Sequence, residues 1–116
     1  MTKTGILFMV LIMAGSLTLY AANVDKGKAL FESPKLGGGT TGKSCKTCHN
    51  GGEGLDKDLL ATNQFTIMGK TKNSLAEVIN VCIENPLGGK AIDPEGEEMQ
   101  DLIAYIKTLV AKPAAQ

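Results

Sequence analysis

The chain has 116 residues, which is enough for one small domain with a limited hydrophobic core. Its 12 basic residues are all lysines and balance 12 acidic residues, so the formal net charge is +0. Near-neutrality argues against nucleic acid as a partner. Small domains often depend on a covalent staple or a cofactor, and the three cysteines are the first candidates for holding one.

Residues 1–22 have the layout of a secretory signal peptide. Lys3 precedes an uncharged apolar run over 6–19, and the small residues Ala21 and Ala22 follow it. We expect cleavage after Ala22 or Ala21 and export to the periplasm. The alternative is an uncleaved membrane anchor, although a bilayer-spanning helix needs about 20 apolar residues and this run is shorter. Membrane contact is expected only if the leader is retained.

The mature domain is expected over 23–112, with a flexible tail over 113–116. An exported domain enters an oxidising compartment, where spare thiols tend to form disulfides. Three cysteines cannot all pair with one another, so at least one of them has a different role or none.

Helical patterning appears first over 24–33, where Pro34 closes the segment. A second helix is predicted after Ser74, which forms a capping-box pair with Glu77, and it ends before Pro86. Its apolar stripe comprises Leu75, Val78, Ile79, Cys82 and Ile83.

The last helix is predicted to have Asp93 as N-cap and Pro94 at its first position. Its buried stripe comprises Met99, Leu102, Ile103, Ile106, Leu109 and Val110. Residues 55–72 show only one helical turn, around Leu59 and Leu60. Because almost nothing alternates with period two, the predicted fold class is all-α.

Glycine-rich residues 37–44 match the phosphate-binding pattern G-x-x-x-x-G-K-[ST] in full. That motif functions between a buried strand and a helix of a parallel sheet. Here it follows a proline-broken helix end, and the flanking sequence has no strand pattern. We therefore expect no nucleotide as a partner.

The residues that follow, Cys45-Lys-Thr-Cys48-His49, match the attachment motif of a covalent haem. Two thiols add to the porphyrin vinyl groups, and the adjacent histidine becomes the proximal iron ligand. A thioredoxin-type redox pair would require a βαβ context. A zinc site would need Cys82 as a fourth ligand beside two crowded neighbours. A disulfide between Cys45 and Cys48 would close a strained ring.

With this motif the mature chain resembles the class I c-type cytochromes. Further signs are Gly27 and Phe31 on the first helix and Tyr105 on the last. The resemblance implies three to four helices wrapped around one covalent haem, with the first and last helices crossing. It also implies electron transfer between redox partner proteins as the activity.

Residues 69–109 look more closely like the cytochrome domain of thiosulfate dehydrogenases and related sulfur-oxidising cytochromes. In those proteins the cysteine of an "INxC" helix is the distal haem ligand, and that position corresponds here to Cys82. A small buried hydrophobe is the alternative role for this cysteine. Met99 and Met68 are competing distal ligands, and an open iron site is a further possibility.

The predicted function is that of an exported one-electron carrier. Lys43 and Lys46, expected beside the haem, are candidates for steering an acidic partner. The alternative is a haem enzyme, or the haem subunit of one, that oxidises thiosulfate or a related sulfur anion at iron ligated by Cys82.

Overall fold

The computed structural model describes residues 19–111, so most of the predicted leader and the whole predicted tail lie outside the described residues. The helices are α1 (Val24–Glu32), α2 (Cys45–Cys48), α3 (Leu75–Glu84) and α4 (Glu97–Val110). Short 3-10 turns cover Leu36–Gly38, Asn50–Gly52 and Lys57–Leu60, the last of which contains the turn predicted around Leu59 and Leu60. The predicted helical class is confirmed. None of the helices within 19–111 is long and apolar enough to cross a bilayer.

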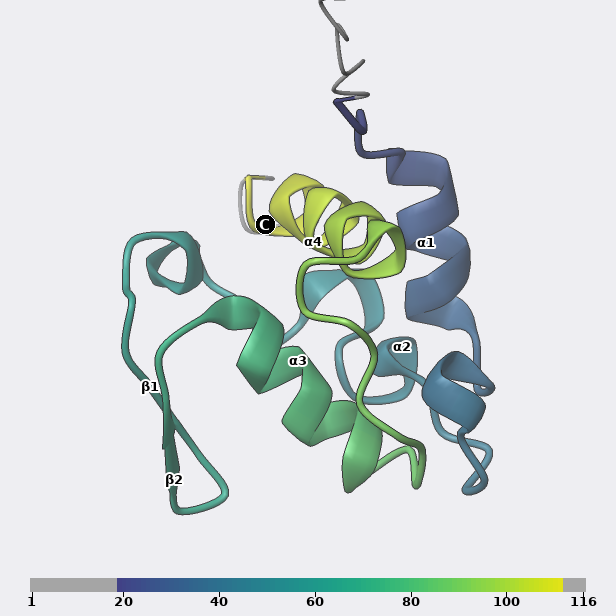
Figure 1. Cartoon of the computed structure of the whole chain (residues 1–116). Coiled ribbons are helices and arrows are strands. Elements are labelled where there is room, and N and C mark those ends of the chain that lie inside the picture. The colour runs from purple at the N-terminus through teal and green to yellow at the C-terminus, as the bar shows by residue number, and fades with distance from the viewer. Residues whose placement is uncertain (1–18, 112–116) are drawn as a thin grey trace, which may run out of the picture.

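Helices α1 and α4 cross, as predicted (Figure 1). Gly27 is buried at the crossing, where a Cβ atom would overlap the backbone carbonyl of Asp101. One turn further along α1, the ring of Phe31 meets that of Tyr105 edge-on, with 5.2 Å between their centroids and 68° between their planes. A glycine at the contact permits close helix approach, and the aromatic pair fills the space beside it.

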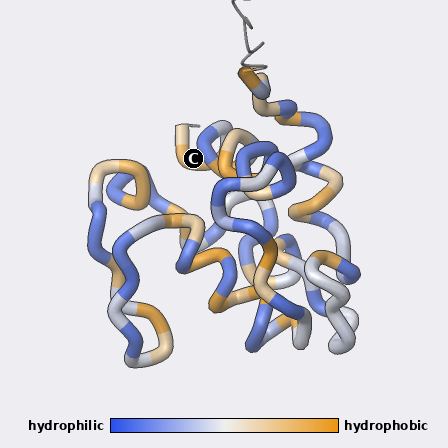
Figure 2. Tube along the Cα trace, viewed as in Figure 1, coloured by the Kyte–Doolittle hydropathy of each residue, from blue (hydrophilic) through white to orange (hydrophobic). Residues whose placement is uncertain are grey.

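Helix α3 begins where the capping residues predicted, because Ser74 Oγ accepts a hydrogen bond from Glu77 N at 3.2 Å. The Glu77 carboxylate reaches back to Asn73 N at 2.7 Å, one residue earlier than in a standard capping box. The helices contain both polar and apolar residues (Figure 2), as amphipathic helices require. The buried core comprises Phe31, Leu36, Ala76, Ile79, Ile83, Leu87, Met99, Leu102, Ile106 and Leu109.

The predicted start of the last helix is wrong. Helix α4 has Gly96 as its N-cap, and the residues before it form a separate turn. In that turn Asp93 Oδ1 accepts from Glu95 N at 2.9 Å, and the Asp93 carbonyl accepts from Gly96 N at 3.1 Å. The Asp-Pro pair therefore caps a local turn, a role that uses the same side-chain chemistry as a helix cap.

A small hairpin was missed by the sequence pattern. Strands β1 (Phe65–Ile67) and β2 (Lys70–Lys72) pair antiparallel and project beside the helices (Figure 1). Their turn contains Met68 at φ 50° and Gly69 at φ 74°, the left-handed angles that a two-residue hairpin turn requires. Strands of three residues are too short to produce a recognisable alternation.

Candidate haem site

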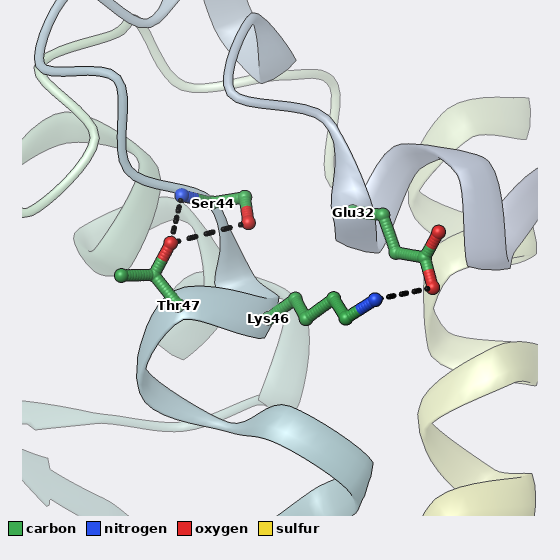
Figure 3. Close-up of polar contacts among 4 residues, drawn as sticks. All are labelled: Glu32, Ser44, Lys46 and Thr47. Carbon is green, nitrogen blue, oxygen red and sulfur yellow. Dashed lines mark hydrogen bonds and ion pairs between the residues drawn. The ribbon is translucent and has the colours of Figure 1, made fainter.

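The attachment motif forms a single helical turn, α2, over Cys45–Cys48. Ser44 precedes α2 and donates its N–H to Thr47 Oγ1 at 2.9 Å, which ties the turn to its own start (Figure 3). Lys46 points away from this pair and meets Glu32 of α1, with 3.4 Å between Nζ and Oε1. This ion pair is exposed and contributes little to stability. The turn places Cys45 and Cys48 one above the other.

The His49 ring has a defined orientation. Its Nδ1 lies 2.7 Å from the backbone oxygen of Glu53. Because a carbonyl oxygen only accepts, Nδ1 carries the hydrogen and donates it, which leaves the Nε2 lone pair free to bind a metal. Gly54 lies against the same ring, since a Cβ there would be 3.4 Å from Nδ1. The 50–54 turn thus orients the imidazole, and sequence patterns do not reveal a contact made by a backbone oxygen.

All three cysteines are free thiols. Cys45 and Cys82 are half-buried and Cys48 is exposed. Burial raises the pKa of Cys45 to about 11, and the neighbouring Cys82 contributes to that rise. Burial likewise raises the pKa of Cys82, with Cys48 as the second cause. Coupling among the three thiols therefore adds to the effect of burial on these pKa values.

The two methionines considered as distal ligands lie in contrasting environments. Met99 is 0% exposed in the core at the start of α4. Met68 lies at the tip of the β1–β2 hairpin and is 56% exposed. Cys82 is thus half-buried on α3, Met99 is packed in the core, and Met68 is more than half exposed.

Residues 37–44 do not form a phosphate-binding loop. Within the described chain the only sheet is the antiparallel β1–β2 pair, and the segment begins inside a 3-10 turn rather than after a strand. Gly37 adopts φ 62°, and its carbonyl accepts a hydrogen bond from Lys90 N at 2.8 Å. The glycines serve the backbone packing of this loop.

The donor set fits covalent haem c. It provides two reduced thiols on one turn and an imidazole with a free Nε2. Within residues 19–111 no three His, Cys, Asp or Glu side chains gather to hold a bare metal ion, the arrangement that the zinc alternative requires. A haem iron needs no such cluster, because the porphyrin nitrogens supply most of its ligands.

Sequence reasoning missed one buried acidic residue at the helix crossing. Asp101 is 4% exposed, and its Oδ1 accepts from Asn23 N at 2.6 Å and from the Tyr20 hydroxyl at 2.7 Å. Burial by itself raises the pKa of Asp101, but the bonds from Asn23 and Tyr20 and the charge of Lys26 outweigh it and lower the pKa. Asp101 thereby joins the start of α1 to α4 at the helix crossing.

A family model described as the SoxA/TsdA cytochrome c domain matches residues 26–111. No curated protein and no solved structure matches the chain. The matched span includes the attachment turn, α3 with Cys82, and nearly all of both crossing helices. The chain therefore belongs to the SoxA/TsdA cytochrome c domain family.

Proposed function

We propose that this chain is an exported monohaem cytochrome that carries single electrons between redox partner proteins. Its family transfers electrons through covalently bound haem c. The observation that carries the proposal is the attachment turn, which combines two free thiols with an imidazole held through Nδ1 by the Glu53 carbonyl. In this proposal Cys45 and Cys48 form the haem thioethers and His49 is the proximal iron ligand. The sequence contains one such motif, which supports one haem per chain.

We assign the distal position to Cys82. Cys82 is half-buried on α3, whereas Met68 is largely exposed and Met99 is enclosed by core residues. A thiolate donates negative charge to the iron and favours the ferric state, so a His/Cys haem has a lower potential than a His/Met haem. The carrier therefore belongs at the reducing end of an electron-transfer sequence.

Partner docking at the attachment turn would involve a modest positive surface. Lys43 precedes the motif and Lys46 lies within it, but Lys46 already pairs with Glu32. Lys43 forms no ion pair within the described residues. One or two exposed charges change mainly the association rate, so binding of an acidic partner is expected to be weak and sensitive to salt.

A second candidate function is oxidation of thiosulfate or a related sulfur anion. The match to the SoxA/TsdA cytochrome c domain favours it, with Cys82 as the sulfur that would lie beside the haem. An anionic substrate would require cationic groups near Cys82, and the chain contains no arginine to provide a bidentate contact. We therefore rank this function below the carrier.

Absorption spectroscopy and electrochemistry of the purified protein test the ligand assignment. The oxidised protein should lack the far-red charge-transfer band of a methionine–iron bond, and Cys82→Met should introduce that band and raise the midpoint potential. A methionine band in the wild type would refute ligation by Cys82.

Turnover measurements separate the two functions. The carrier exchanges electrons with small redox mediators but does not oxidise thiosulfate when an electron acceptor is present. Steady thiosulfate oxidation that disappears in Cys82→Ala would show that the protein is an enzyme and not only an electron carrier.

A further inference from the structure

Two loops that are distant in the sequence are joined by a set of backbone and side-chain hydrogen bonds. The loops are residues 37–41 and 86–90, and we call their junction the clasp. Its bonds are Thr40 N to Leu87 O at 2.9 Å, Thr41 N to Leu87 O at 3.3 Å, Thr40 Oγ1 to Gly88 O at 3.1 Å, Thr41 Oγ1 to Pro86 O at 2.8 Å and Lys90 N to Gly37 O at 2.8 Å.

The clasp explains why this part of the chain is rich in glycine. A Cβ on Gly37 would lie 2.5 Å from Ile83 Cγ2 and would overlap the Lys90 carbonyl. A Cβ on Gly88 would lie 2.6 Å from Thr40 Oγ1. Both glycines also adopt positive φ, 62° and 66°, which side chains disfavour. The resemblance to a phosphate-binding loop thus reflects two loops in close contact.

Each side of the clasp leads to a candidate haem sulfur. On one side, Leu87 N donates to the Cys82 carbonyl at 3.2 Å. The carbonyl of the same Leu87 accepts the Thr41 N–H, so a single residue connects the α3 backbone to the opposite loop. On the other side, Thr41 Oγ1 accepts from Lys43 N at 3.3 Å, two residues before Cys45 begins α2.

We propose that Thr41 is a positioning residue that holds Cys82 at ligating distance from a haem tethered at Cys45 and Cys48. This inference rests on the proposed ligation by Cys82. Two thioethers fix the haem to α2, so the distance from iron to Cys82 depends on how firmly α3 is held against the segment preceding α2. The Thr41 hydroxyl acts at that junction, because it donates to Pro86 O and accepts from Lys43 N.

Thr41→Val retains the shape of the side chain but removes the hydroxyl, so the exposed Pro86 carbonyl and Lys43 N–H must bond to water instead. Loss of one such hydrogen bond corresponds to a change of about two- to tenfold in an equilibrium constant. If the hydroxyl holds Cys82 in place, an external ligand should displace Cys82 more readily by that factor.

The experiment is a spectrophotometric titration of the oxidised holoprotein with imidazole. Thr41→Val should bind imidazole about two- to tenfold more tightly than the wild type. Thr41→Ser, which keeps the hydroxyl, should behave as the wild type does. Thr71→Val is the matched control, because Thr71 is exposed on β2 and far along the chain from the clasp.

Thermal unfolding of the same variants distinguishes positioning from a general structural role. A Thr41→Val protein that melts earlier but binds imidazole as the wild type does would overturn the proposal. An equal change in Thr71→Val would overturn it as well. Cys82→Ala tests the underlying ligation separately, since an imidazole affinity equal to that of the wild type would show that Cys82 is not a ligand.

Discussion

Replacement of Gly27 by alanine sets two effects on stability against each other. In an exposed helix interior this change stabilises a protein by about 1 kcal/mol, because alanine has the higher helix propensity. At the crossing with α4, however, the new Cβ would lie 2.6 Å from the Asp101 carbonyl carbon and 2.9 Å from Tyr105 Cβ, and it would overlap the Asp101 carbonyl oxygen. Backbone and Cβ atoms cannot rotate away from such a contact.

Relief of the overlap requires α1 and α4 to separate. Carbon atoms in contact normally lie about 3.5 to 4.0 Å apart, so a displacement of the order of 1 Å is needed. That displacement would also loosen the edge-on contact between Phe31 and Tyr105. Overpacking of this kind costs about 1 to 3 kcal/mol, and sometimes more where backbone must move. We expect the clash to outweigh the propensity gain and the net loss to be about 2 kcal/mol.

Thermal denaturation of the holoprotein, followed by far-ultraviolet circular dichroism, measures the outcome. For a domain of this size a loss of about 2 kcal/mol lowers the Tm by roughly 8 to 16 °C. The control is Lys28→Ala on the exposed side of α1, which should change the Tm by only a few degrees, about the effect of a surface substitution. A Tm for Gly27→Ala equal to or above that of the wild type would refute the close crossing.

Three further predictions concern single side chains. Met99→Leu is a volume-conserving change in the core, so it should lower the free energy of unfolding by less than about 1.5 kcal/mol. The absorption spectrum of the oxidised protein should not change. Loss of an absorption band would identify Met99 as a ligand. Asp101→Asn should lower the free energy of unfolding in urea at pH 7. This loss of stability should shrink as the pH falls below 3.8, the ordinary pKa of an aspartate, because a lowered native pKa gives stability only while the carboxylate is ionised. A loss of stability that does not change with pH would contradict this. In the uncleaved chain Tyr20 should ionise near pH 12 in an ultraviolet titration, and Asp101→Asn should return the pKa of Tyr20 toward 10.0. Cleavage after Ala22 would remove Tyr20 and place the new α-amino group on Asn23, whose nitrogen already contacts Asp101.

Features governed by local chemistry were predictable from the sequence. Ser74 caps α3 because its hydroxyl needs only the next turn of the same helix. The crossing was implied by the resemblance to class I c-type cytochromes, and Gly27 and Phe31, two of the residues that carry this resemblance, are buried on α1. The attachment motif is equally local, since its five consecutive residues occupy one turn and its C-cap.

Features created by tertiary contact were not predictable. The start of α4 was misplaced because Asp93-Pro94 suits a turn as well as a helix cap. The role of Thr41 depends on Pro86 O, and the orientation of His49 depends on Glu53 O. Backbone oxygens occur at every residue, so no sequence pattern indicates which of them a side chain will meet.

Mass spectrometry of the exported protein, made in a host that matures c-type cytochromes, is the most direct test of the central claim. We expect an intact mass equal to the polypeptide plus one haem, and a proteolytic fragment spanning Cys45 to His49 that carries the entire added mass. A colourless product with the mass of the bare chain, or a haem that dissociates under denaturation, would contradict it.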